Sequence, residues 1–103
     1  MAGNNGATPL LMASQEGHVP VVQALLQGGA DVDKAMDDGS TPLYIASQKG
    51  HVPIVQVLLR GGAAVDKARD GGVTPLFIAS QYGHLPVVQA LLQGGAAVDK
   101  AAD

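Results

Sequence analysis

The chain has 103 residues, of which 47% are apolar and 15% charged, a composition typical of one soluble globular domain. Six basic and nine acidic residues give a net charge of −3 with no block of Lys or Arg, which argues against binding to nucleic acid or to an anionic membrane. The absence of cysteine excludes disulfides, thiolate zinc sites and cysteine nucleophiles. Because only three residues are aromatic, we expect a core of small and aliphatic side chains.

A 33-residue period organises the whole chain. Thr8-Pro9-Leu10 recurs at 41–43 and 74–76, and Gly17-His18 recurs at 50–51 and 83–84. At 21 of the 33 positions of the period, all three copies carry the same residue. The period predicts a single domain over residues 1–103 that consists of three repeats, at about 3–35, 36–68 and 69–101.

Each repeat predicts two short helices. In the first repeat, Thr8 is suited to cap a helix that begins at Pro9 and ends at Glu16, and Gly17 is suited to a left-handed C-terminal cap. A second helix runs from Val19 to Gln27 and is closed by two glycines. Valine and leucine side chains lie on one face of this second helix, as expected of a helix that packs on a core.

Tight turns are predicted between the repeats. Asn5-Gly6, Asp38-Gly39 and Gly71-Gly72 stand where a turn with positive φ is needed. Helices of eight or nine residues are marginal alone, because isolated helices need roughly 12–15 residues to persist in water. The repeats must therefore stack on one another.

These residues together resemble the ankyrin repeat family. The resemblance rests on the segments 38–47, 50–59 and 62–66 and on their counterparts in the other two repeats. It implies an all-α solenoid of helix-turn-helix units, joined by β-turn or hairpin loops and stacked linearly. The chain departs from the family pattern after Thr-Pro-Leu, where Leu11, Tyr44 and Phe77 stand in place of the usual His.

The repeated histidines His18, His51 and His84 suggest a metal site only at first sight. Stacking places equivalent atoms ~8–10 Å apart, whereas each zinc-bound nitrogen must lie within ~2.1 Å of the metal. The family resemblance implies instead that this His is a structural bridge to neighbouring backbone. We therefore expect no metal and no cofactor.

Other polar residues do not predict an enzyme either. Ser14, Ser47 and Ser80 recur in every repeat, whereas a catalytic site needs one nucleophile in asymmetric surroundings, so we interpret them as small packing residues. The acidic residues Asp31, Asp33, Asp37 and Asp38 lack the spacing of a calcium-binding loop, and we expect them to form turns and to aid solubility.

Positions that differ among the repeats predict where a partner binds. The family resemblance implies that the turn tips and the first helices line a concave surface that contacts protein partners. In the second and third repeats these positions are Met36, Asp37, Asp38, Ser40, Tyr44, Lys49, Arg69, Asp70, Val73, Phe77 and Tyr82, and in the first they are Asn4, Asn5, Ala7, Leu11 and Glu16. Tyrosine and arginine are enriched in binding hot spots, so we expect a patch centred on Tyr44, Phe77 and Tyr82. The alternative is that Tyr44 and Phe77 fill the groove between helices.

The sequence thus predicts a non-enzymatic module that binds a protein partner of unknown identity. The alternative is a structural or engineered scaffold without a partner, which near-identical repeats also suit. The first and third repeats keep the interior pattern and are not dedicated capping repeats, so we expect weak end-to-end self-association. The chain carries no signal or transmembrane segment, and an intracellular location is favoured over others although the sequence names no compartment.

Overall fold

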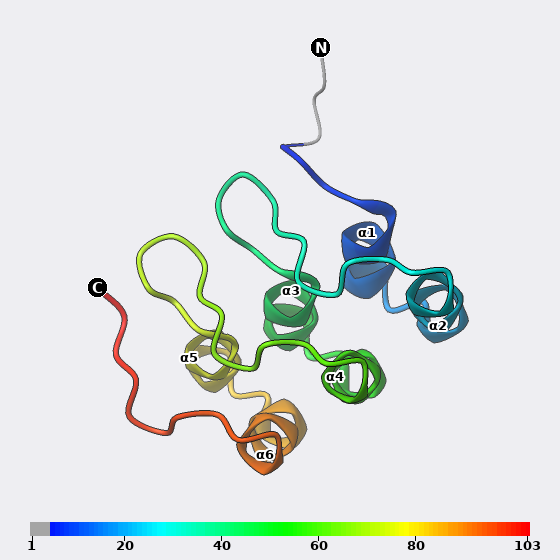
Figure 1. Cartoon of the computed structure of the whole chain (residues 1–103). Helices are drawn as coiled ribbons and strands as arrows, with labels where there is room; N and C mark the ends of the chain where they lie inside the picture. Colours follow the sequence, from blue (N-terminus) through cyan, green and yellow to red (C-terminus); the bar gives the residue numbers. More distant parts are fainter. Residues whose placement is uncertain (1–4) are drawn as a thin grey trace.

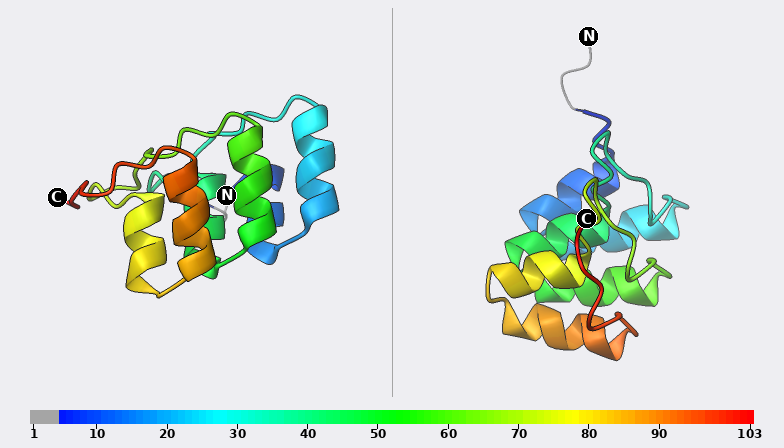
Figure 2. Two further views of the ribbon diagram at one scale, coloured as in Figure 1. Left: turned by 90° about the horizontal axis from the view of Figure 1, so that it is seen from below. Right: turned by 90° about the vertical axis from the view of Figure 1, so that its left-hand side faces the viewer.

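Six helices form two rows in the computed structural model, which describes residues 5–103. They are α1 (Pro9–Glu16), α2 (Val19–Gln27), α3 (Pro42–Lys49), α4 (Val52–Arg60), α5 (Pro75–Gln81) and α6 (Leu85–Gln93). The first helices of the repeats (α1, α3 and α5) make one row and the second helices (α2, α4 and α6) make the other, and the loops between repeats extend beyond the first row (Figure 1). The helical pairs follow one another as layers of a stack (Figure 2). Within residues 5–103 there is no strand, and the predicted all-α repeat architecture is confirmed.

The first helices begin as the sequence predicts. The threonine before each one accepts a hydrogen bond at Oγ1 from the backbone N–H three residues later, at 3.1 Å, and proline occupies the first turn. Two of these helices end at a left-handed glycine, Gly17 or Gly50, with φ of 80°. The third helix ends one residue earlier, at Gln81, and Gly83 follows with φ of 72°. Local cap chemistry therefore sets both ends of α1 and α3 and the start of α5.

Two apolar clusters hold the stack together. The larger one lies between the two rows of helices and includes Leu10, Val22, Leu43, Leu58 and Leu91, as part of a longer set of aliphatic side chains. A smaller cluster lies among the first helices and consists of Leu11, Tyr44, Ile45 and Ile78, with Met36 and Val73 packed against it. The larger core matches the expectation of small and aliphatic side chains. The smaller one corrects it, because Tyr44 heads the largest fully buried side chains.

Backbone hydrogen bonds join the loops of successive repeats. The N–H of Asp37 donates to the carbonyl of Asn5 at 2.9 Å, and the N–H of Asp70 donates to that of Asp38 at 2.8 Å. At the C-terminal end, the N–H of Asp103 donates to the carbonyl of Gly71 at 2.7 Å. The expected positive φ occurs at Asn5, Gly6, Gly39, Gly71 and Gly72 but not at Asp38. The turns thus form a continuous ladder along one edge of the stack.

Histidine side chains also connect the repeats. Nε2 of His51 lies 3.0 Å from the carbonyl oxygen of Gln15, and Nε2 of His84 lies 3.0 Å from that of Gln48. A neutral imidazole with its proton on Nε2 donates in both bonds. His18, in the first repeat, is exposed and has no such partner among residues 5–103. The structural role expected of this histidine is confirmed for the second and third repeats.

Replacing His51 with alanine should lower the free energy of unfolding by about 1–3 kcal/mol, because the half-buried carbonyl of Gln15 loses its donor. The matched change His18→Ala should cost less than about 0.5 kcal/mol, as is usual for an exposed side chain. Urea unfolding followed by circular dichroism measures both values. Equal losses would contradict the bridging role.

Candidate interaction surface

The structure places the predicted partner-binding residues in three environments. The side chains of Asp37, Asp38, Lys49, Asp70, Phe77 and Tyr82 are exposed; those of Met36, Arg69 and Val73 are half-buried; and those of Ser40 and Tyr44 are buried. In the first repeat, Asn5 and Glu16 are exposed, Ala7 is half-buried and Leu11 is buried, while Asn4 lies outside the described residues. The predicted set therefore does not form one exposed patch.

Tyr44 and Ser40 correct the prediction most clearly, since they are only 1% and 2% exposed. Tyr44 packs with Leu11, Ile45 and Ile78 in the smaller cluster, and the Cζ atom of Arg69 lies 5.4 Å from the centroid of its ring. This is the groove-filling role given above as the alternative. Phe77 occupies the same repeat position but is 41% exposed, because no repeat packs over it among residues 5–103.

The Tyr44 phenol is buried without a hydrogen-bond partner among residues 5–103. Burial raises the pKa of this phenol above its ordinary value, and the positive charge of Arg69 only partly offsets the effect. The phenol is therefore neutral at physiological pH. It contributes area and a ring face for Arg69, but its hydroxyl opposes folding.

Replacing Tyr44 with phenylalanine should raise the free energy of unfolding by about 1 kcal/mol, because it removes an unpaired buried hydroxyl and keeps the ring. The control Tyr82→Phe changes an exposed tyrosine and should leave stability unchanged. Urea unfolding of both variants tests the expectation. A loss of stability in Tyr44→Phe would mean that the hydroxyl has a bonding partner.

Asp38 is held in place at the tip of its turn. Its Oδ1 accepts a hydrogen bond from the backbone N–H of Ser40 at 2.9 Å. Desolvation alone would raise the pKa of this carboxyl, but the hydrogen bonds from Ser40 and the charge of Arg69 outweigh it, so the pKa is lowered. Asp31 makes the same type of bond, accepting from the N–H of Asp33 at 3.0 Å. The turn-forming role expected of the aspartates is confirmed at these two positions.

Exposed charge remains along the turn tips and at the ends of the first helices. Asp37, Asp38 and Asp70 lie on successive turns of the ladder and form an acidic edge. Lys49 and Tyr82 occupy the same repeat position, at the C-terminal ends of α3 and α5, and both are exposed. The Tyr82 ring is 56% exposed and its centroid lies 6.1 Å from that of His84.

No group of three or more His, Cys, Asp or Glu side chains within residues 5–103 is arranged to hold a metal ion. The serines do not form a catalytic group either. Ser14 Oγ donates to the carbonyl of Leu10 at 2.7 Å, Ser47 is buried, and Ser80 is exposed on the last repeat. The packing role is confirmed for Ser14 and Ser47, and Ser80 is the exception.

Comparison with protein families decides the assignment. A family model for ankyrin repeats matches three copies over residues 10–102, which is most of the chain. The chain belongs to the ankyrin repeat family. None of the curated proteins compared with it gives a match.

Ankyrin repeats are generally protein-interaction modules and are typically non-enzymatic. In this ankyrin-repeat chain, none of the helices in the described part is long and apolar enough to cross a membrane. The middle repeat is the best guide to free surface, because it has a neighbour on each side. Its exposed positions on the loop tip and first helix are Asp37, Asp38 and Lys49.

Proposed function

We propose that this chain is a non-enzymatic interaction module that binds a protein partner through its turn tips and the exposed ends of its first helices. The observation that carries the proposal is the exposure of Asp37, Asp38 and Lys49 in the middle repeat, where the other variable side chains of the loop tip and first helix are buried or half-buried. At each of these positions the residue is not the same in all three repeats. Because the side chains are exposed, packing in the core does not restrict which residue stands there. Tyr44 and Ser40 do not belong to the proposed surface.

The chemistry of this surface favours a partner segment with basic residues. Three exposed aspartates on adjacent turns concentrate negative charge at one edge, which would attract and orient a basic segment. Tyr82, at the C-terminal end of α5, supplies a large exposed ring on the third repeat, and such rings are frequent binding hot spots. The aspartates would set the rate and orientation of binding, and the ring would supply contact area.

The test compares two triple variants for capture and titration of a partner from the source cells. Asp37→Asn, Asp70→Asn and Tyr82→Ala together should weaken binding by about a hundredfold or more, because each hot-spot residue lost costs on the order of 1–2 kcal/mol. Gln23, Gln56 and Gln89 are exposed on the second helices, and replacing them with alanine provides the matched control, which should leave binding unchanged. Loss of binding in the control and not in the first variant would refute the proposed surface.

A structural or engineered scaffold without its own partner is the second candidate. It is favoured by the identity of all three repeats at 21 of 33 positions. Under this alternative, no saturable partner is captured by the unmodified chain. Binding that saturates and is lost in the Asp37, Asp70 and Tyr82 variant would exclude it.

A further inference from the structure

Large exposed apolar side chains occur only at the two ends of the stack within residues 5–103. They are Met12 and Val21 in the first repeat and Phe77, Tyr82, Leu85, Leu92 and Val98 in the third. The middle repeat contributes none. At Met12, Val21 and Phe77 the exposure follows from stacking, since the side chains at the same positions of the other repeats are buried.

One set of these residues marks an N-terminal face. Val21 is 47% exposed, whereas Ile54 and Val87, at the same position of the later repeats, are 1% and 0% exposed. Met12 is likewise exposed, and its counterparts Ile45 and Ile78 are buried. In the second and third repeats these positions are covered by the preceding repeat. We call Met12, Val21, and the exposed His18 beside them the head face.

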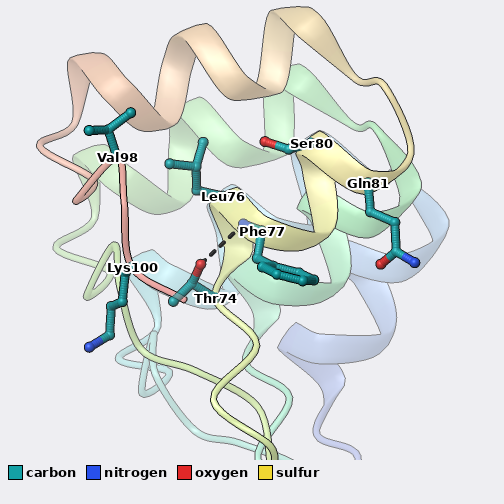
Figure 3. Close-up of a pocket in the computed structure, with 7 residues that line it drawn as sticks. All are labelled: Thr74, Leu76, Phe77, Ser80, Gln81, Val98 and Lys100. Carbon is teal, nitrogen blue, oxygen red and sulfur yellow. Dashed lines mark hydrogen bonds between the residues drawn. The ribbon is translucent and has the colours of Figure 1, made fainter. Parts of the chain in front are cut away.

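The opposite set marks a C-terminal face. Phe77 is exposed while Leu11 and Tyr44 are buried, and Ser80 is exposed while Ser14 and Ser47 are buried. Phe77 and Ser80 line one side of a groove of about 510 Å³, and Val98 from the C-terminal segment lines the other side (Figure 3). We call Phe77, Ser80, Leu92 and Val98 the tail face.

Polar groups on the two faces match each other as well. Inside the chain, the histidine of one repeat bonds to the carbonyl of Gln15 or Gln48 in the repeat before it. The equivalent carbonyl, that of Gln81, faces no histidine, and His18 faces no such carbonyl within residues 5–103. The unused acceptor is thus on the last repeat and the unused donor is on the first.

The same match holds for close packing at the second helices. A Cβ built on Gly61 would lie 3.2 Å from Leu26 Cδ1, and one built on Gly94 would lie 3.2 Å from Leu59 Cδ1. The third leucine at this repeat position is Leu92, on the tail face, and the first glycine at the facing position is Gly28, in the first repeat. Because α2 and α6 differ only at their first residue, α2 can repeat the packing that α6 makes on α4.

We propose that the head face of one copy of this chain docks on the tail face of a second copy, continuing the interface between its own repeats. His18 would donate to the carbonyl of Gln81, and Val21 would be covered as Ile54 and Val87 are within one chain. Such an interface joins two different surfaces and leaves one of each free, so association gives open chains of copies and not a closed dimer.

Two features weaken this docking. The backbone N–H of Asp103 already donates to the carbonyl of Gly71, so the C-terminal segment occupies the next place on the turn ladder. In addition, the carboxylates of Asp33 and Asp66 accept hydrogen bonds from the N–H groups of Ala64 and Ala97 in the following repeat. Between two docked copies, Asp99 of one copy takes the position of Asp33, and Asp31 of the other copy takes the position of Ala64. Docking would therefore bring two carboxylates together where the internal interfaces have only one.

Sedimentation of blocked variants tests the proposal. The unmodified chain should increase in average mass over roughly 10 μM to 1 mM, the range of a weak interface. Val21→Lys blocks the head face and Leu92→Lys blocks the tail face; each alone should stay monomeric, and an equimolar mixture should form a dimer and nothing larger. Gln56→Lys, on the exposed side of the middle repeat, should associate like the unmodified chain.

Circular dichroism establishes that each variant is folded before it is compared. Val21 and Leu92 are already exposed, so we expect lysine at either position to leave the fold intact. Replacing Asp31 with asparagine should tighten association by roughly 2–5-fold, because it removes the repelling charge and keeps the oxygen that accepts from the N–H of Asp33. An unmodified chain that stays monomeric near 1 mM, self-association of Leu92→Lys alone, or a mixture that does not pair would overturn the proposal.

Discussion

Replacing Leu58 with alanine should lower the free energy of unfolding by about 3–5 kcal/mol, among the largest losses expected of a single core substitution in this chain. Leu58 lies on α4 in the middle repeat, has no exposed surface and belongs to the larger apolar cluster. Alanine would leave a cavity that neighbouring helices can close only in part. Because α4 packs on both α2 and α6, the cavity would weaken two inter-repeat contacts at once.

The matched variant Leu25→Ala should cost about 1–2 kcal/mol, because a half-buried leucine loses less apolar contact. Leu25, Leu58 and Leu91 occupy the same position of the three repeats, so the same chemical change is made at each. Leu91 is fully buried against the preceding repeat, and Leu91→Ala should resemble Leu58→Ala. Urea unfolding by circular dichroism gives the three values, and equal losses at Leu25 and Leu58 would contradict the account of burial by stacking.

Most of the fold could be predicted from the sequence because the signals that define it are local. A threonine followed by proline caps and starts each first helix, and the structure has all three caps with Oγ1 as acceptor. Glycine ends the first two of these helices because the left-handed cap suits it. Such chemistry acts within four or five residues, and so a single repeat contains the information.

The interaction surface was harder to predict, because it depends on how one repeat covers the next. Tyr44 was expected on the surface since its position varies among the repeats, yet it is buried. The side chains at that position are Leu11, Tyr44 and Phe77, all large and mainly apolar, and variation of this kind indicates adjustment of a core. By contrast, Glu16, Lys49 and Tyr82 vary in charge as well as size, and all three are exposed.

The contacts between turns could not be predicted at all from residue types. They are bonds between backbone groups, such as that from the N–H of Asp70 to the carbonyl of Asp38, and no side chain signals them. Their spacing is set by the stack as a whole. Stacking also explains why Phe77 and Tyr44, which occupy the same repeat position, differ in exposure.

Replacing Gly50 with alanine should lower the free energy of unfolding by about 2–4 kcal/mol, the sum of a strained backbone and a weakened hydrogen bond. Gly50 has φ of 80°, which alanine adopts only with strain. A Cβ there would lie 3.0 Å from Cε1 and Nδ1 of His84, so the imidazole must shift by a few tenths of an ångström, which strains its bond to the carbonyl of Gln48. The control is Gly83→Ala, since Gly83 has φ of 72° but no atom within 4 Å of its Cβ position. This control should show the backbone cost alone, about 1–2 kcal/mol.

A double-mutant cycle separates the two contributions to the cost at Gly50. In a His84→Ala background the imidazole is absent, so Gly50→Ala should cost no more than Gly83→Ala does in the unmodified chain. Urea unfolding of the four proteins in the cycle, with Gly83→Ala beside them, supplies the comparison. If the cost of Gly50→Ala is the same with and without His84, the contact between this glycine and the histidine of the next repeat contributes nothing to stability. A cost that falls to the Gly83→Ala value assigns the difference to the bridge between repeats, and the same reasoning then applies to Gly17 and His51, whose ring atoms lie 3.2–3.4 Å from the Cβ position of that glycine.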